Sequence, residues 1–357
     1  MRGAVMTQYK QQLEVRDLPD PAPGPADAII QTEACGVCRS DWHIWQHHWS
    51  WLGIEVTLPR VLGHEFGGTI VEVGRDVKAF RVGDRVTVPF HLGCGHCEQC
   101  RAGRYNLCLA YGVIGIHHDG GYGSLVKVPS ADSTLVGLPE SVDALTAAAL
   151  GCRFMTSYHG IVDQAAVRPG EWVAVFGIGA VGLSAVQIAA ATGARVIAVG
   201  RSPQKLAKAV EEGAEATVVA GPDAAAHIIE ITKGGAAVTV DALGSRETTL
   251  PALHALRKYG RHLQVGLTGP DEAGVMPIPM DLVVFNELRI VGSLGCPIAS
   301  YTGMLSLVAA GKLQPTRLVE TVASVSDAGR LLDNMTDYNT VGFSIINNWG
   351  AAAALAA

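Results

Sequence analysis

Four cysteines share a short segment that is otherwise rich in glycine and small side chains: Cys94, Cys97, Cys100 and Cys108. Thiolates at this spacing can surround one tetrahedral ion, and an all-cysteine shell is typical of structural zinc. An iron–sulfur cluster is the competing interpretation, because Cys-x2-Cys-x2-Cys also opens a bacterial ferredoxin motif. That motif continues after three residues with Cys-Pro, whereas here the gap is seven residues and Leu109 follows. The spacing therefore predicts a closed zinc site, with His96 outside it.

Two further cysteines and a histidine are dispersed along the chain: Cys38, His64 and Cys152. Each residue alone is more typical of a core thiol or of a satisfied histidine. Together, two cysteines and one histidine leave a fourth zinc position open for water or substrate, as catalytic zinc requires. Asp41 and Glu65 are the nearby carboxylates. We expect both to support the ligands from outside, and Glu65 could also serve as an alternate ligand.

A glycine motif, GIGAVG, directly follows the apolar strand WVAVF and opens a predicted helix. Its candidate cofactor-binding residues are Gly177, Gly179, Ala180, Val181 and Gly182. A glycine triad alone is weak evidence and could be a structural turn, but a strand before it and a helix after it are the required context. The motif predicts that the pyrophosphate of a dinucleotide sits on the helix N-terminus.

The elements around these motifs change character along the chain. Residues 28–136 show short apolar runs broken by Gly and Pro, which is typical of a β-rich module with long loops. From about residue 171, strands alternate with helices of 10 to 15 residues, which predicts a parallel, doubly wound α/β sheet. After about residue 291, a predicted helix at 301–310 and the strand-like TVGFSIINN return to the first module. The length of 357 residues agrees with about two domains.

Composition excludes several classes of protein. The 27 Lys and Arg against 33 Asp and Glu give a net charge of -6 without a basic run, so no nucleic acid partner is expected. The most apolar stretch, 173–191, carries three glycines and Gln187, so no membrane partner is expected. The N-terminus lacks the pattern of an export signal, which predicts a cytoplasmic protein with reduced or metal-bound thiols.

On these motifs and their order, the chain resembles the zinc-containing medium-chain alcohol dehydrogenases over about residues 23–347. The resemblance implies a GroES-like catalytic domain at 1–153 and 291–357 that carries both zinc ions. It implies a Rossmann domain at 154–290 that binds the nicotinamide dinucleotide. The catalytic zinc ligands would be Cys38, His64 and Cys152, a set known from alcohol dehydrogenase, and the four-cysteine run would hold the structural zinc.

The resemblance also assigns roles around Cys38. Arg39 matches a residue that binds the cofactor pyrophosphate, Ser40 the hydroxyl of a proton relay, and His43 its outer histidine, although His43 could be an ordinary surface residue. Further positions implied at the cofactor or the pocket wall are Phe90, Gly266, Leu267 and Leu294. The short connection from Cys108 to Cys152 is that of tetrameric relatives, so we expect a homotetramer, with a dimer as the alternative.

The implied function is the interconversion of an alcohol and an aldehyde or ketone by hydride transfer to or from NAD(P), on a small-molecule substrate. The alternatives are a non-catalytic zinc- and nucleotide-binding regulator and a quinone-reductase-like enzyme, and the intact zinc and relay residues argue against both. Between His43 and His64 lies a loop with three tryptophans and two histidines: Trp45, His47, His48, Trp49 and Trp51. These aromatics either form an apolar rim for bulky or aromatic substrates or pack the loop.

The sequence also addresses the choice of cofactor. NAD-binding domains usually place an Asp or Glu about 20 residues past the glycine motif, to accept a hydrogen bond from the ribose hydroxyl. Here the strand ARVIAV ends in Gly200-Arg201, and residues 198–203 contain no acid. Arg201 and Lys205 could pair with a 2′-phosphate instead. We therefore expect NADP(H) in preference to NAD(H), unless Arg201 points into solvent or stacks on adenine.

Overall fold

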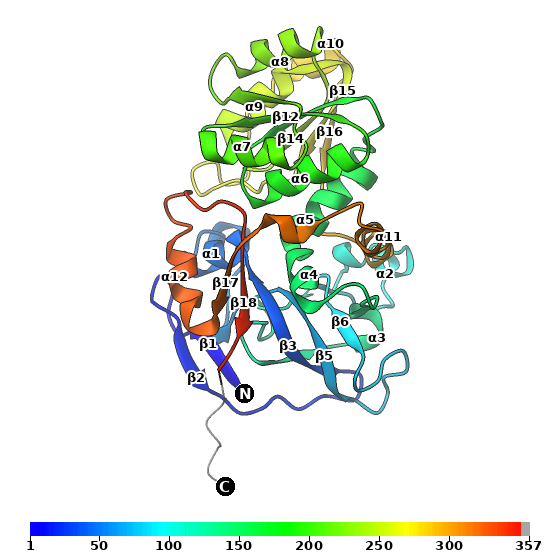
Figure 1. Cartoon of the computed structure of the whole chain (residues 1–357), viewed down its shortest axis with the longest axis vertical. Helices are drawn as coiled ribbons and strands as arrows, with labels where there is room; N and C mark the ends of the chain where they lie inside the picture. Colours follow the sequence, from blue (N-terminus) through cyan, green and yellow to red (C-terminus); the bar gives the residue numbers. More distant parts are fainter. Residues whose placement is uncertain (111, 351–357) are drawn as a thin grey trace. The chain divides into compact units, whose positions relative to one another are not determined.

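The computed structural model describes residues 1–110 and 112–350 and divides into two compact units (Figure 1). Unit 1 comprises Met1–Met155 with Gly295–Ala357, and unit 2 comprises Thr156–Leu294. Residues 351–357, which belong to the predicted first domain, lie outside the described residues. The chain passes from unit 1 into unit 2 within one helix, α5 (Cys152–Tyr158).

Unit 1 is built on a mixed sheet with the strand order β10-β6-β5-β3-β18-β17, in which β9 also pairs with β3. A second sheet has the order β2-β1-β4, and β7 pairs with β8. The strands are β1 (Arg2–Met6), β2 (Glu14–Asp17), β3 (Ala28–Val37), β4 (Arg60–Val61), β5 (Glu65–Val73), β6 (Arg85–Thr87), β7 (His91–Leu92), β8 (Gly112–Val113), β9 (Leu125–Val128), β10 (Val136–Gly137), β17 (Val319–Ser324) and β18 (Phe343–Asn348).

The centre of this sheet positions the first group of functional residues. Strand β3 runs antiparallel to β5, with Gly36 opposite Glu65, so the end of β3 meets the start of β5. Strand β18 pairs with the other edge of β3, with Ser344 opposite Val37. Because Cys38 directly follows β3 and His64 directly precedes β5, this register brings the two side chains together.

The helices of unit 1 are short and lie in the connections between strands. They are α1 (Arg39–Trp45), α2 (Glu98–Arg101), α3 (Ala131–Thr134), α4 (Ala144–Ala149), the start of α5, α11 (Ile298–Ala309), α12 (Ala328–Asp333) and the 3-10 turns η1 (Ser50–Leu52), η2 (Tyr105–Leu107), η4 (Pro315–Leu318) and η5 (Val325–Asp327). The predicted helix at 301–310 corresponds to α11, which begins three residues earlier, directly after Pro297.

Unit 2 contains a parallel sheet with the strand order β13-β12-β11-β14-β15-β16. Every neighbouring pair in it is parallel, which confirms the predicted doubly wound α/β sheet. In such a sheet the strand order reverses beside the first strand, and ligands bind outside the carboxyl ends of the strands there. The strands are β11 (Trp172–Phe176), β12 (Arg195–Gly200), β13 (Ala216–Val219), β14 (Ala236–Asp241), β15 (Leu256–Gln264) and β16 (Arg289–Gly292).

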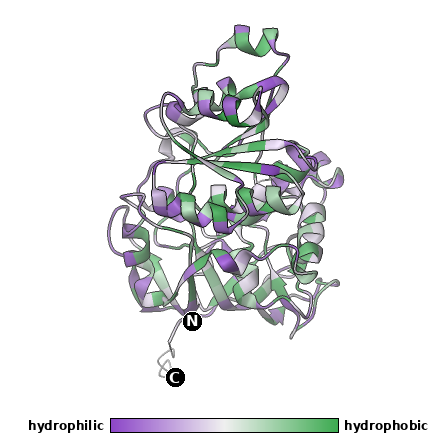
Figure 2. Ribbon diagram, turned by 45° about the horizontal axis from the view of Figure 1, so that its top comes forward, coloured by the Kyte–Doolittle hydropathy of each residue, from purple (hydrophilic) through white to green (hydrophobic). Residues whose placement is uncertain are grey.

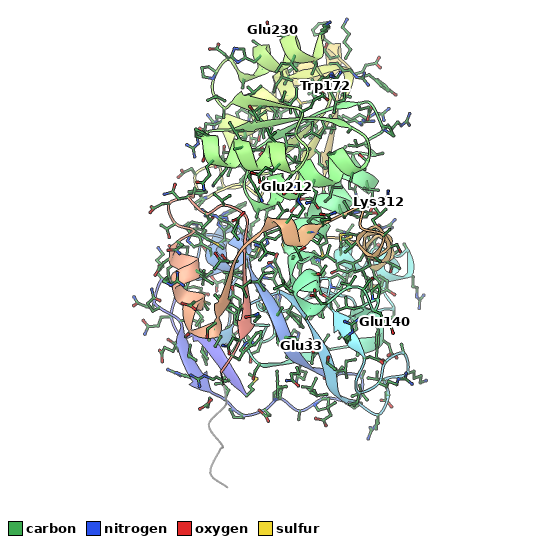
Figure 3. All side chains as sticks on the ribbon, in the orientation of Figure 1. Glu33, Glu140, Trp172, Glu212, Glu230 and Lys312 are labelled. Atoms are coloured by element: carbon green, nitrogen blue, oxygen red, sulfur yellow. The ribbon has the colours of Figure 1, made fainter. Side chains whose placement is uncertain are left out.

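Helices cover both faces of this sheet, because right-handed crossovers to the two sides of β11 place them on opposite faces. They are the π-helix η3 (His159–Gln164), α6 (Ala180–Ala191), α7 (Pro203–Glu211), α8 (Ala224–Thr232) and α9 (Arg246–His254). A further helix of this unit, α10 (Met280–Phe285), has no buried residue. Helix α6 packs beside α7, where Gln187 donates to Glu212 at 2.6 Å, and α8 packs beside α9. Glu212 is labelled in Figure 3.

The core of unit 2 follows from the apolar strands. Phe176, Ile197 and Val199 pack against Ile228 of α8 and Ala252 of α9. Figure 2 shows that the helices carry both hydrophobic and hydrophilic residues along their length, as expected of helices with one buried face. The apolar stretch at 173–191 forms β11 and α6, and among the described residues no helix is long and apolar enough to cross a bilayer.

Candidate metal centres and dinucleotide site

The structure brings the four cysteines of the short run together around η2 and α2. Their Sγ atoms all lie within 4.8 Å of one another. Cys94 and Cys100 have Sγ atoms 4.0 Å apart, as do Cys97 and Cys108. Zinc bound tetrahedrally at about 2.3 Å from sulfur separates its ligand atoms by about 3.8 Å. The cluster therefore fits one zinc ion, whereas the exposed His96 pairs its Nδ1 with the Cys94 carbonyl oxygen at 2.8 Å.

Backbone N–H groups prepare these thiols for a cation. The Cys94 N–H donates to Cys108 Sγ at 3.3 Å, and the Cys97 N–H donates to Cys94 Sγ at 3.4 Å. The backbone of Leu109, followed by that of Cys100, lowers the pKa of Cys97 to about 6. Hydrogen bonds of this kind stabilise the thiolate, which is the form that binds metal.

A second cluster forms where β3, β5 and α5 meet in unit 1. The ligand atoms of its members lie within 4.8 Å of one another: Cys38, His64, Glu65 and Cys152. Cys38 is the N-cap of α1, and Cys152 begins α5. Two thiols and one imidazole match a zinc site that keeps an open position. The structure thus assembles the three dispersed residues and adds a carboxylate beside them.

Asp41 orients the histidine and the first cysteine of this cluster. Its Oδ1 lies 3.0 Å from His64 Nδ1, and its Oδ2 accepts from the Cys38 N–H at 3.0 Å. Tyr122 also donates to Oδ2 at 3.0 Å. With Nδ1 held by the carboxylate, Nε2 of His64 carries the lone pair for a metal. Burial lowers the pKa of His64, but Asp41 outweighs burial and, with Cys38, raises it well above the ordinary value.

Glu65 is fully buried and forms an ion pair with Arg153. Arg153 Nε donates to Glu65 Oε1 at 3.0 Å, and Nη2 donates to Oε2 at 2.5 Å. Arg153 itself is only 3% exposed. The carboxylate expected either to support the ligands or to join them therefore has a cationic partner of its own.

The residues that follow Cys38 lie on α1. Ser40 Oγ is 3.7 Å from Cys38 Sγ and 4.0 Å from Cys152 Sγ, so its hydroxyl borders the second cluster. Arg39 lies between the rings of Trp42 and Tyr338, 3.9 and 3.7 Å from their centroids, and donates to the Met335 carbonyl oxygen. Within the described residues, its Nη2 is buried without a hydrogen-bond partner.

His43 stacks on Trp49 with 4.8 Å between ring centroids. Burial, with smaller effects of Arg39 and His48, lowers the pKa of His43 to about 3. Its Nδ1 is buried and has no hydrogen-bond partner among the described residues. His43 is therefore a neutral imidazole at ordinary pH.

The aromatic loop is largely packed. Trp45 is buried and donates from Nε1 to the Gln11 carbonyl oxygen at 2.6 Å, and Trp49 is also buried. His47 stacks on Tyr9 at 4.2 Å between ring centroids. These contacts favour the packing interpretation for these residues, and Trp51 keeps part of its surface exposed.

The glycine motif of unit 2 has the geometry that a dinucleotide needs. Gly177 has φ +88, a conformation that L side chains rarely adopt. A Cβ on Gly182 would overlap the Gly177 carbonyl oxygen, so this glycine lets α6 pack closely against the turn. Gly179 is exposed, and a Cβ there would meet no described atom within 4 Å, which leaves room for a phosphate. Ala180 and Val181 begin α6, which no side chain of the described residues caps.

Two loops border this motif at the carboxyl ends of β14 and β15. The backbone of Gly266 packs directly against that of Leu243 and Gly244, so a Cβ on Gly266 would overlap both. Leu267 is exposed by 48% and Leu294, which follows β16, by 41%. Leu243 is similarly exposed at 42%. Exposed leucines at these strand ends offer apolar surface to a flat ring.

The loop after β12 contains the residues expected to read the ribose. Gly200 is buried, and a Cβ there would lie 3.2 Å from Ile178 Cγ1 and 3.4 Å from Leu206 Cδ2. Arg201 is exposed. Lys205 lies in the first turn of α7 and donates its N–H to Ser202 Oγ at 3.4 Å.

Two family models match the chain: the alcohol dehydrogenase GroES-like domain over residues 24–140 and the zinc-binding dehydrogenase domain over residues 180–310. An NAD-dependent alcohol dehydrogenase from Sulfurisphaera tokodaii is 34% identical over 354 residues, which cover 97% of this chain and 99% of the relative. The chain belongs to the zinc-containing medium-chain alcohol dehydrogenases.

Solved structures agree with this family. The alcohol dehydrogenase from Thermus sp. ATN1 has a TM-score of 0.88 at 30% identity and covers 98% of this chain and 100% of its own. A zinc-binding dehydrogenase from Sinorhizobium meliloti bound to NADP has a TM-score of 0.85 at 30% identity, covering 97% and 98%. The predicted GroES-like domain with a Rossmann sheet is confirmed. The enzyme is an oxidoreductase of a family that uses zinc and NAD(P) to act on alcohols.

Sequence reasoning missed three buried residues that organise these sites in the enzyme. Arg153 pairs with Glu65, and Tyr122 donates to Asp41. Asp241, at the end of β14, accepts from the N–H groups of Leu243 and Gly244, both at 2.9 Å, and fixes the loop beside Gly177. Asp241 could have been found from the sequence, because an acid directly follows the apolar run AAVTV. For Arg153 and Tyr122, no neighbouring residue in the sequence indicated a partner.

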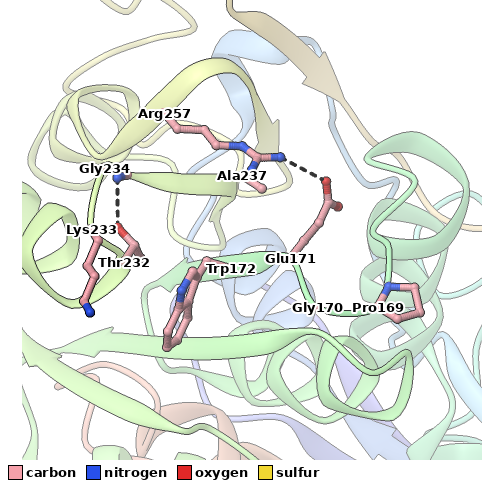
Figure 4. A pocket seen from close by; sticks show the side chains of 10 residues that line it. Pro169, Gly170, Glu171, Trp172, Thr232, Lys233, Gly234, Ala237 and Arg257 are labelled. Atoms are coloured by element: carbon pink, nitrogen blue, oxygen red, sulfur yellow. Dashed lines mark hydrogen bonds and ion pairs between the residues drawn. The ribbon is translucent and has the colours of Figure 1, made fainter.

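Unit 2 has a hollow of about 430 Å3 (Figure 4), and no residue of the glycine motif lines it. It is lined by Trp172, Ala237 and Arg257, which stand at the amino ends of β11, β14 and β15. Arg257 forms an ion pair with Glu171 at 3.5 Å. Because dinucleotides bind at the carboxyl ends of such strands, this hollow is not the cofactor site.

Substitutions at two glycines of the motif should distinguish a role in packing from a role in cofactor binding. In Gly182→Ala the methyl group overlaps the backbone of Gly177, and we expect a loss of about 1–3 kcal/mol in unfolding free energy, as for other overpacked sites. Gly179→Ala meets no described atom, so it keeps the melting temperature but obstructs phosphate approach and weakens NAD(P)H binding. Thermal unfolding and fluorescence titration measure both effects. Normal NAD(P)H affinity in Gly179→Ala contradicts this assignment.

The buried His43 makes stability depend on pH. Its pKa of about 3 in the folded chain lies below the ordinary 6.5, so the unfolded chain takes up the proton first as the pH falls. The contribution of neutral His43 to the free energy of unfolding is complete above about pH 6.5. It is lost as the pH falls towards 3, by no more than about 1.4 kcal/mol per pH unit. We expect His43→Gln to flatten the loss of urea stability between pH 7 and pH 5.5. The exposed His227→Gln is the control, and equal slopes for the two variants refute the argument.

Proposed function

We propose that the enzyme interconverts an alcohol and an aldehyde or ketone with NAD(P) as hydride acceptor or donor, using the second cluster of unit 1 and the glycine motif of unit 2. The observation that carries the proposal is the open ligand set of Cys38, His64 and Cys152, with His64 oriented by Asp41. In a protein that only binds ligands, a structural metal site has all four positions filled by protein side chains. Only a reaction centre needs a position left for substrate.

We further propose two zinc ions per chain, one in each cluster. The four cysteines would hold a structural ion, and Cys38, His64 and Cys152 the catalytic one, with Glu65 beside it. Bound at the second cluster, zinc supplies a Lewis acid for the substrate oxygen. The chain itself contributes thiolates, an oriented imidazole and a neighbouring hydroxyl.

The dinucleotide would lie on the N-terminus of α6. Gly177, Gly179, Ala180, Val181 and Gly182 leave backbone N–H groups and open space for its pyrophosphate. Its nicotinamide supplies the hydride acceptor or donor. The orphaned Nη2 of Arg39 supports a further contact with the pyrophosphate, and Gly266 and Leu267 support contacts with the ring.

The proton released from an alcohol needs acceptors within the protein. Ser40 Oγ borders the sulfur atoms of the second cluster, which supports a role in accepting this proton. His43 would act as a neutral imidazole that accepts on one nitrogen while donating from the other, since its low pKa prevents storage of the proton.

We propose a bulky or aromatic alcohol or ketone as substrate. The Phe90 ring lies 5.5 Å from the His64 ring, which supports an apolar wall at the reaction centre. Trp51 retains exposed surface in the aromatic loop, whereas Trp45 and Trp49 are used in packing. The contribution of the loop to specificity would therefore come from Trp51.

We also propose a homotetramer. Strand β16 is the last strand of the parallel sheet, and its Ile290 is 45% exposed. On the preceding helix α10, Val284 is 68% and Phe285 is 83% exposed. An open strand edge beside exposed apolar side chains supports association between copies of the chain.

The metal assignment predicts two zinc equivalents per chain by elemental analysis. Cys38→Ala should retain one equivalent, remain folded and lose alcohol-dependent NAD(P)H formation. Cys100→Ala should instead lower the melting temperature first, because a structural zinc contributes folding free energy. A Cys38→Ala variant that keeps most of its activity, or a Cys100→Ala variant with an unchanged melting temperature, contradicts the assignment of that cluster.

The cofactor proposal is NADP(H) in preference to NAD(H), with Arg201 and Lys205 paired to the 2′-phosphate. One charge-assisted hydrogen bond is worth about 1.5–3 kcal/mol, or about 10 to 150-fold in affinity. Gly200→Asp combined with Arg201→Ala should shift kcat/KM toward NAD by a factor in that range. Gly200→Ala, which meets the same neighbours Ile178 and Leu206, controls for packing. A wild-type preference for NAD, or no shift in the double variant, defeats the proposal.

A further inference from the structure

Glu65 is a carboxylate that could close the catalytic metal site. It is fully buried, and its carboxylate oxygen lies within 4.8 Å of the ligand atoms of Cys38, His64 and Cys152. Carboxylate oxygens bind zinc at about 2.0–2.2 Å, and a fourth protein ligand converts an open site into a closed one. Something must therefore keep this carboxylate from the metal if a substrate is to bind there.

Arg153 occupies both oxygens of that carboxylate. Its Nε and Nη2 donate to Oε1 and Oε2 in a two-pronged pair, and its backbone N–H donates to Oε1 at 3.2 Å. A bidentate guanidinium fixes the plane of a carboxylate as well as its position. The pair therefore sets the direction in which Glu65 points.

The surroundings hold the guanidinium in place. Arg153 Nη1 donates to the Val37 carbonyl oxygen at 3.2 Å, and the guanidinium lies over the Phe343 ring, 4.0 Å from its centroid. A Cβ on Gly36 would overlap Glu65 Oε2, so only glycine fits at this point of β3. Contacts from β3, β18 and α5 thus converge on one ion pair.

We propose that Arg153 is a positioning residue that holds Glu65 out of the coordination shell of the catalytic zinc and so keeps the fourth position open for substrate. The proposal rests on the proposed zinc site. Without Arg153, the buried carboxylate has no cation of its own, and an unpaired buried charge is strongly unfavourable. The metal is then its nearest partner, and the site closes.

The test uses a cycle of four proteins: wild type, Arg153→Met, Glu65→Gln and Arg153→Met with Glu65→Gln. Each protein is loaded with Co2+ in the catalytic cluster, and imidazole is titrated against the visible absorption of the cobalt to report an open position. We expect Arg153→Met to bind imidazole about 10 to 100-fold more weakly than wild type. Removal of the hydrogen-bond partners of metal ligands typically lowers metal affinity or activity by a factor in this range. Removing the carboxylate as well should restore binding toward that of Glu65→Gln.

Turnover of alcohol should follow the same order, so that Arg153→Met is slower than the double variant. A merely structural role for Arg153 predicts the opposite, because the second substitution would only add damage. If Arg153→Met does not fold, Arg153→Lys is compared with Arg153→Lys combined with Glu65→Gln. Lysine keeps the positive charge but cannot form the bidentate hydrogen bonds of the guanidinium.

The outcomes separate this inference from the proposed function. Imidazole binding in Arg153→Met equal to wild type, or a double variant no better than Arg153→Met, overturns the role of Arg153. Failure of wild type to take up Co2+ at the second cluster, or to bind imidazole once loaded, overturns the open metal site itself and with it this inference.

Discussion

The pairing of β3 with β5 is the constraint on which the proposed reaction centre of unit 1 depends. Gly36 opposite Glu65 fixes the point where one strand ends and the other begins, so Cys38 and His64 emerge side by side. Side chains alternate between the faces of a strand, and a slip of one residue would send every one of them to the other face. The proposed metal ligands are therefore positioned by backbone hydrogen bonds before any ion binds.

Charge balance is the second requirement of this region. Asp41 and Glu65 are both buried, and each has a cationic or hydrogen-bond-donating partner: His64 and Tyr122 for the first, Arg153 for the second. Buried carboxylates are tolerated only with such partners. Each carboxylate is thereby committed to one task, since Asp41 orients a ligand and Glu65 is held by the guanidinium.

The sequence was most informative where chemistry depends on rare residue types at short spacing. The four-cysteine run and the glycine motif were visible because their members lie within a few residues of one another, and the structure gives each the geometry its motif requires. The start of α11 was placed three residues late, since its N-cap is Pro297, which makes no side-chain capping hydrogen bond that would mark the helix start. Arg153 and Tyr122 were missed because their partners lie 88 and 81 residues away, and such pairings depend on tertiary structure.

The position of β18 in the chain has a consequence for biogenesis. This strand follows every other described strand in the sequence, yet it pairs with β3 in the middle of the unit 1 sheet. During synthesis the parallel sheet of unit 2 is complete before β18 leaves the ribosome, and domains generally fold as units in order of synthesis. The four cysteines lie within fifteen residues, so their cluster can form early in synthesis, whereas the sheet around Cys38 and His64 is complete only when β18 has been made. The two clusters of unit 1 are therefore completed at different stages of synthesis.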